Sequence, residues 1–227
     1  MRPHNIITQQ PFDDFQANVN EDKPNHSEIV ICLRDRFLYM DLTQDAYMQI
    51  MFDLRYPQSM ICPMDNSHLQ RFLNSLHTWL RRAGLNHQYV WVWEESRDGG
   101  HHYHVCLLVQ ASSYYPFHTV MEKIKALWGL GFGITGRHGL VWDYTKDTNG
   151  NPIDVNGRII SHDDPNRQQV LNNGQRWASY LAKCRTKENC PENLRGYGAS
   201  QLPDPSTWMR VPVQRQDPWL QRPPMPR

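Results

Sequence analysis

Two histidines separated by one residue, His102 and His104, lie in the run HHYHVCLLVQ at 101–110. Successive side chains of a β-strand point to opposite faces, so the two imidazoles would point the same way and could hold one divalent ion. The alternative is a chance pair on a half-exposed strand, which is the commoner meaning of an isolated pair in a chain with 11 histidines. The pair therefore indicates a metal site only if further ligands lie beside it.

Two carboxylates, Glu94 and Glu95, end the preceding apolar run and stand eight and seven residues before His102. If the two runs pair as a hairpin, one carboxylate lies beside the histidines. Two imidazoles and a carboxylate suit Mg²⁺ or Mn²⁺ with open positions for water or a phosphate, and would also bind zinc. The unknown register leaves the choice between the two glutamates open. A strand end that becomes polar at the surface, or a pair with Arg97, is the alternative interpretation.

A tyrosine and a lysine three residues apart, Tyr180 and Lys183, lie in the helical run WASYLAK at 177–183, next to Arg176. Nearby positive charge favours the phenolate and holds a DNA phosphate, so Tyr180 could attack a phosphodiester. An exposed tyrosine on a solvated face is the alternative, and it ranks first if this motif is taken alone. The order of the three motifs along the chain gives them their weight.

The segments that carry these motifs show the hydrophobic periodicity of short strands and amphipathic helices. Predicted strands cover residues 29–33, 47–55, 88–95, 102–110, 140–144 and 158–160. Predicted helices run from Asn66 to Gly84, over 117–128 and over about 165–187. This order, β-β-α-β-β-α-β-β-α, indicates α+β architecture, an antiparallel β-sheet with helices packed on one face.

The motifs and their order resemble the filamentous-phage and prophage replication initiators of the HUH endonuclease superfamily. The resemblance covers roughly residues 50–200, and the spacing between the carboxylates and the histidines is its specific part. The matching runs are MFDLRY at 51–56, YVWVWEE at 89–95, HHYHVCLLV at 101–109, WASYLAK at 177–183 and RGYGASQ at 195–201.

The resemblance implies a ferredoxin-like α/β plait of the Rep type, with His102, His104 and Glu94 as ligands of Mg²⁺ or Mn²⁺. It implies Tyr180 as the nucleophile and Lys183 as an assisting cation. The implied activity is rolling-circle initiation: one strand of single-stranded or origin DNA is nicked through a 5′-phosphotyrosine link, which leaves a 3′-OH primer. With one motif tyrosine, a second strand transfer needs another subunit or another hydroxyl.

Composition indicates one globular domain, 27–201, between a polar N-terminal arm, 1–26, and a proline-rich tail, 202–227. The five cysteines are odd in number and form no C-x-x-C, which favours reduced thiols. No apolar run is long enough to span a membrane and no signal peptide begins the chain, so we expect a protein of the bacterial host cytoplasm without a membrane partner.

The DNA-binding surface is less clear from composition. A formal net charge of +1 does not by itself indicate a nucleic-acid binder, although residues 123–137 and 176–195 are locally basic. We expect no more than one or two of the aromatic residues near the motifs to stack on bases, since core packing explains most of them equally well, and we expect His101 to face solvent. No phosphate-binding glycine loop with its lysine is present, so we expect no ATPase activity, and strand separation would need a host helicase. A host polymerase is the other expected protein partner. The aromatic candidates are Trp91, Trp93, Trp142 and Tyr144.

Two other functions fit the same motifs. One is a DNA-binding regulator on this fold that no longer nicks, which would form no covalent adduct. The other is a metal-dependent phosphodiesterase in which Tyr180 has no role, so that Tyr180→Phe would leave activity largely intact.

Overall fold

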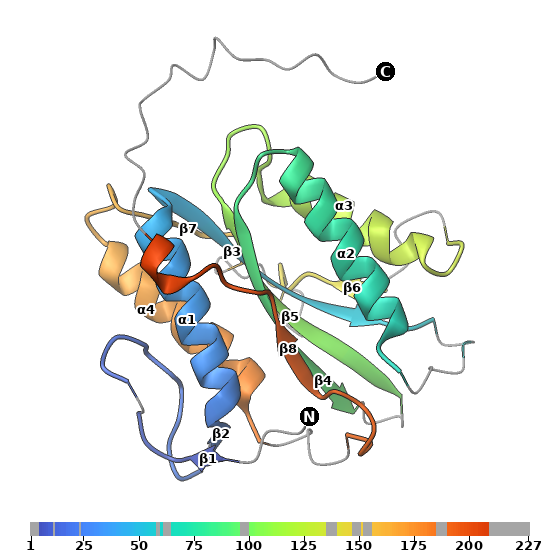
Figure 1. Ribbon diagram of the computed structural model, residues 1–227, viewed down its shortest axis with the longest axis horizontal. Helices are drawn as coiled ribbons and strands as arrows, with labels where there is room; N and C mark the ends of the chain where they lie inside the picture. The colour runs from blue at the N-terminus through green and yellow to red at the C-terminus, as the bar shows by residue number, and fades with distance from the viewer. Residues whose placement is uncertain are drawn as a thin grey trace.

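The computed structural model describes residues 5–10, 12–22, 24–57, 60, 65–95, 100–134, 140–146, 151, 156–184 and 190–208. They form an α+β fold with helices packed on an antiparallel sheet (Figure 1), as predicted. The helices are α1 (Ser27–Thr43), α2 (Ser67–Arg82), α3 (Phe117–Leu130) and α4 (Arg167–Ala178), with 3-10 turns η1 (Ser179–Ala182) and η2 (Pro205–Thr207). The strands are β1 (Ile6–Ile7), β2 (Asn25–His26), β3 (Ala46–Arg55), β4 (His87–Glu95), β5 (His101–Gln110), β6 (Val141–Trp142), β7 (Ile159–Ser161) and β8 (Tyr197–Ala199).

The main sheet has six strands in the order β6-β3-β5-β4-β8, and β7 also pairs with β3. All of its pairs are antiparallel. From β3 to β6 the chain runs β-α-β-β-α-β, which is the connection of a ferredoxin-like α/β plait. The long hairpin β4–β5 and its neighbour β3 form the centre of this sheet.

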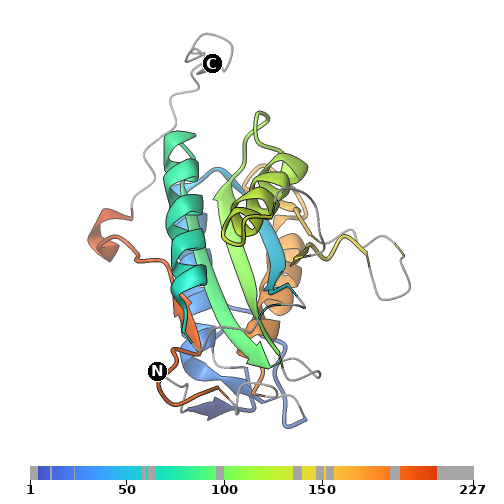
Figure 2. The same cartoon turned by 90° about the vertical axis from the view of Figure 1, so that its right-hand side faces the viewer.

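Helices cover both faces of the sheet, where the sequence predicts cover on one face only. The plait helices α2 and α3 stand side by side on one face (Figure 2), over Phe52 and Val105. Outside the plait, α1 and α4 cover the other face, over Met51 and Val92. The reason is visible in β3, whose residues from Tyr47 to Leu54 are buried without alternation. A strand that is apolar on both sides needs cover on both sides.

Residues 29–33, predicted as a strand, belong to the long helix α1. The β-branched run Ile29-Val30-Ile31 favours a strand locally, but a longer window shows a helical stripe. Buried positions recur at Ile29, Leu33, Phe37 and Met40, which is the spacing of one helix face. The packing of that stripe on the sheet outweighs the local β-propensity.

The last predicted helix is shorter than expected and ends in a 3-10 turn. Helix α4 stops at Ala178 and η1 follows, while residues 185–187 of the prediction lie outside the described residues. The Ser179 hydroxyl donates to the Arg176 carbonyl at 2.7 Å and accepts the Asn18 N–H at 2.8 Å. A side chain that bonds backbone groups in this way competes with the helix ladder.

The segment predicted as a polar N-terminal arm packs against α1, α4 and η1. Phe15 is fully buried, with its ring 5.9 Å from that of Phe37, and the Gln16 N–H donates to the Gln175 side-chain oxygen at 2.8 Å. Mostly irregular backbone has no periodicity, so its sequence does not reveal this packing.

Across the described ranges, no helix is long and apolar enough to cross a membrane.

Candidate metal and nucleophile site

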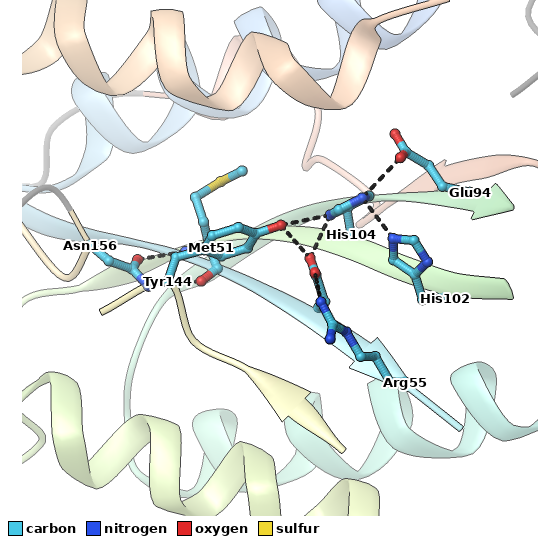
Figure 3. A network of polar contacts seen from close by, with 8 residues as sticks. Met51, Arg55, Glu94, His102, His104, Tyr144 and Asn156 are labelled. Atoms are coloured by element: carbon cyan, nitrogen blue, oxygen red, sulfur yellow. Dashed lines mark hydrogen bonds and ion pairs between the residues drawn. The ribbon is translucent and has the colours of Figure 1, made fainter. Parts of the chain in front are cut away.

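Strand register gathers the chemically active side chains on the face that α1 and α4 cover. In β5, His104 pairs with Asp53 of β3, and His102 pairs with Glu94 of β4. Paired residues of antiparallel strands share a face, and positions two apart share it too. Two imidazoles and two carboxylates from three adjacent strands therefore point into one space, and Figure 3 shows Glu94, His102 and His104 turned toward one another.

His104 is the centre of this cluster, and its two ring nitrogens face different partners. Its Nε2 lies 2.9 Å from Nε2 of His102 and 3.0 Å from Oε2 of Glu94. Its Nδ1 lies 2.5 Å from Oδ1 of Asp53 and 3.0 Å from the hydroxyl of Tyr144. That hydroxyl also donates to Oδ1 of Asp53 at 2.7 Å. The imidazole is therefore held in orientation from its Nδ1 side.

Burial makes these contacts electrostatically strong, since His104, Asp53 and Glu94 are 6%, 2% and 5% exposed. Burial alone would lower the pKa of His104, but hydrogen bonds with Asp53 and Glu94 raise it to about 9. Burial, followed by the charge of His104, lowers the pKa of His102 to about 4. The two carboxylates thus create a place for one positive charge beside a neutral imidazole.

The pKa values of Asp53 and Tyr144 are also shifted. Burial would raise the pKa of Asp53, yet hydrogen bonds from His104 and Tyr144 bring it below the usual value. Burial and the charge of Asp53 raise the pKa of the Tyr144 hydroxyl well above its ordinary value. Asp53 therefore stays an acceptor and Tyr144 stays a donor.

The cluster fits a divalent metal ion. Asp53, His102 and His104 offer donor atoms within 4.8 Å of one another. A histidine that binds a metal through Nε2 commonly donates its Nδ1–H to a carboxylate, and Asp53 stands in that position. Of the two carboxylates, Glu94 is the one on the Nε2 side, where both imidazoles present a nitrogen.

The register separates the two glutamates that the sequence leaves equivalent. Glu94 pairs with His102 and contacts His104, whereas Glu95 pairs with His101. His101 itself is buried against Tyr56 and Trp93 on the opposite face, so the expectation that it faces solvent is wrong.

Tyr180 comes to the cluster from η1. Its ring lies 5.8 Å from that of His104 in an edge-to-face arrangement, and the residue is 41% exposed. Nζ of Lys183 lies 3.1 Å from the centroid of the Tyr180 ring. Side chains three apart eclipse each other in a 3-10 turn, which brings this cation over the ring. The structure thus brings together the five residues to which the resemblance gives a role: Glu94, His102, His104, Tyr180 and Lys183.

The sequence does not single out Asp53, and it does not indicate that the Tyr144 hydroxyl belongs to the cluster. A signal for Asp53 exists, since it is the acidic residue within the otherwise apolar or neutral strand run YMQIMFDL. Tyr144 is predicted as a base-stacking candidate, but its hydroxyl turns into the cluster and its ring packs edge-on against Trp177. Its backbone adopts φ 50°, in the left-handed region that is rare outside glycine.

Comparison with known proteins bears on the same region. Residues 49–189 match the model of the family described as replication-associated protein ORF2. No curated protein and no solved structure matches the chain. The matched segment spans β3 to η1 and contains every residue of the cluster, and the family description supports a replication initiator. Because the match extends over more than half of its length, the chain belongs to the replication-associated protein ORF2 family.

Proposed function

We propose that this chain is an HUH-type, metal-dependent DNA nickase that initiates rolling-circle replication by cutting one strand with Tyr180. The observation that carries the proposal is the surroundings of His104. Its ring meets a second imidazole, two carboxylates and the edge of a half-exposed tyrosine within one cluster. A ligand set for a divalent ion beside a tyrosine matches the needs of tyrosine-mediated strand cleavage.

In this proposal, Nε2 of His102, Nε2 of His104 and the carboxylate of Glu94 hold Mg²⁺ or Mn²⁺. Asp53 and Tyr144 act behind them, since both face Nδ1 of His104 and keep Nε2 directed at the ion. The bound ion would polarise a non-bridging oxygen of the scissile phosphate.

The protein's own residues carry the covalent step. The phenolic oxygen of Tyr180 loses its proton and bonds to phosphorus, while the bond from phosphorus to the 3′-oxygen breaks and that oxygen takes up a proton. The products are a 5′-phosphotyrosine link and a free 3′-OH. Lys183, whose cation lies on the Tyr180 ring, favours the phenolate. Because one phosphate ester replaces another, the reverse reaction rejoins the strand without ATP.

The substrate in this proposal is single-stranded or extruded origin DNA in a bacterial cell that carries a phage or prophage. The 3′-OH left by the nick would prime a host polymerase, and a host helicase would separate the strands.

The decisive experiment looks for a covalent adduct. The protein is incubated with Mn²⁺ and labelled single-stranded DNA tiled across its own genome, and a denaturing gel separates linked from free DNA. We expect a labelled protein band from the wild type. Tyr180→Phe and the double variant His102→Ala/His104→Ala should both abolish it. Tyr114→Phe is the matched control, because Tyr114 is exposed and lies between β5 and α3, outside the cluster.

Each other outcome selects one of the remaining functions. Cleavage without an adduct, unaffected in Tyr180→Phe, would favour a metal-dependent phosphodiesterase. DNA binding without cleavage or adduct, over the full set of DNAs and metals, would favour a regulator that does not nick.

A further inference from the structure

An exposed tryptophan lies beside the cluster on the same face of the sheet. Trp142 of β6 pairs in register with Asp53 of β3, so its side chain shares the face of His104. It is 40% exposed, whereas Trp91 and Trp93 are buried in the core on the other face. Of the aromatic residues predicted to stack on bases, Trp142 is therefore the one with an accessible ring beside the cluster.

A half-exposed arginine stands between Trp142 and the histidines. Arg55 pairs in register with His102, and its guanidinium carbon lies 5.6 Å from the centroid of the Trp142 ring. Its backbone is fixed on both sides, because its N–H donates to the Leu140 carbonyl at 2.8 Å and its carbonyl accepts the Trp128 indole N–H at 2.7 Å. Arg55 and Trp142 therefore both belong to paired strands of the sheet rather than to a loop.

The charges around this pair favour an anion. The guanidinium has five N–H donors and makes one hydrogen bond to Asp53, at 3.3 Å, among the described residues. Oδ1 of Asp53 is itself engaged by Nδ1 of His104 and by the Tyr144 hydroxyl. Asp143, which follows Trp142 in the chain, forms an ion pair with Lys125 at 2.9 Å and accepts a hydrogen bond from the Thr145 hydroxyl at 2.7 Å. The side chain of Arg55, 48% exposed, thus keeps donors for a phosphate.

We propose that Trp142 and Arg55 form a nucleotide-binding subsite for single-stranded DNA, with a base stacked on the indole and a phosphate bound by the guanidinium. An aromatic face and a cation side by side are the two elements of sequence-tolerant single-strand binding. Neighbouring strands lie about 4.8 Å apart, so β6 is only two strand spacings from β5 and its histidines. The bound nucleotide is therefore close to the scissile phosphate. The identity of the ligand, though not the geometry of the pair, rests on the proposed nickase function.

Binding without cleavage tests this subsite. The full-length protein in EDTA is titrated into two fluorescent 30-nucleotide probes, oligo(dT) and an abasic strand of the same length, and anisotropy gives both affinities. We expect Trp142→Ala to weaken oligo(dT) binding about 10-fold and to change abasic binding little, because the variant removes only the stacking on a base. Trp142→Phe should retain most of the preference for bases.

Arg55→Ala should act on the phosphate instead. The slope of log affinity against log salt should fall by about 0.7 for each phosphate that the variant no longer binds, while the preference for oligo(dT) over the abasic strand remains. The matched controls are Trp79→Ala and Lys123→Ala, another cation–aromatic pair with 6.0 Å between cation and ring centroid on the opposite side of the sheet. Circular dichroism checks that each variant is folded.

The results separate this inference from the nickase proposal. Three results would overturn it. One is an equal loss of affinity for both probes in Trp142→Ala and Trp142→Phe. The others are a loss of affinity of the same size in the control variants, or a wild type that binds oligo(dT) no more tightly than the abasic strand. Since the assay needs no chemistry, a negative adduct experiment leaves a positive binding result standing. Normal adduct formation with unchanged binding in Trp142→Ala would reject the subsite alone.

Discussion

At the scale of single residues, His104 shows how one imidazole can contact different partners through its two ring nitrogens. Its Nε2 faces His102 and Glu94, and its Nδ1 faces Asp53 and Tyr144. A ring held on one side presents its other nitrogen in a defined direction, which lowers the entropy cost of binding an ion. The two carboxylates therefore contact different nitrogens of the ring, and different substitutions test what each of them does.

Exchange of each glutamate for glutamine tests the register of the hairpin. We expect Glu94→Gln to remove most Mn²⁺ affinity, because an amide is a weaker ligand than a carboxylate at a site for a hard cation. Glu95→Gln, one residue further along the strand and paired with His101, should bind Mn²⁺ like the wild type. Isothermal titration of both variants gives the answer, and similar affinities in the two would contradict the assignment.

Asp53→Asn tests the positioning of His104. The amide no longer stabilises the Nδ1–H form of the imidazole, so we expect Mn²⁺ affinity to fall about 10–100-fold with the other ligands in place. Arg55→Ala, which removes the other ionic partner of Asp53, serves as the control and should keep most of the affinity. Unchanged affinity in Asp53→Asn would show that the carboxylate has no role in metal binding.

At the scale of elements, the contact between α4 and β3 brings η1, which carries Tyr180, to the sheet. Gly174 allows a close approach, since its carbonyl accepts a hydrogen bond from the buried Gln49 amide at 3.0 Å. A Cβ at this position would collide with the side-chain oxygen of Gln49. Although a glycine destabilises a helix interior, Gly174 is thus the residue that lets α4, and with it η1, dock.

Gly174→Ala should destabilise the protein. Overpacking of a buried contact costs typically 1–3 kcal/mol, and here the displaced group is a buried hydrogen-bonded amide. Urea unfolding followed by circular dichroism measures the difference in the free energy of unfolding. Gln169→Ala, an exposed position of the same helix, should change it little. A Gly174→Ala variant as stable as the wild type would mean that α4 packs less tightly against Gln49 than this contact implies.

At the scale of the whole molecule, the site joins segments that are far apart in the chain. β3, the β4–β5 hairpin, the residues after β6, and η1 each contribute at least one side chain to it. The site exists only when the sheet and the layer formed by helices α1 and α4 are assembled together. A ligand that binds this assembled site and not the unfolded chain must stabilise the fold.

Mn²⁺ should therefore raise the melting temperature. At a free concentration of 100 times its Kd the ion adds about 2.7 kcal/mol, or roughly 5–10 °C for a chain of this size. EDTA should reverse the shift, and His102→Ala/His104→Ala should show none. Scanning calorimetry measures it, and an equal shift in the double variant would indicate that the ion binds elsewhere.

The sequence alone determines the local features of this protein. Alternation around His102 and His104 puts both imidazoles on one face, and the spacing of Leu69, Phe72 and Leu73 predicts α2. The hairpin and the α+β class follow from the same periodicities. These features depend on neighbours within a few residues, and side-chain period reports them directly.

Only the tertiary structure decided which residues meet across the chain. Strand register placed Glu94 rather than Glu95 beside the histidines, the pairing of β3 with β5 brought Asp53 to His104, and docking of α4 brought Tyr180 to the cluster. Cover on both faces of the sheet also made residues 29–33 helical. These outcomes depend on long-range packing free energies, which no local period encodes, so they could not be read from the spacing of residues.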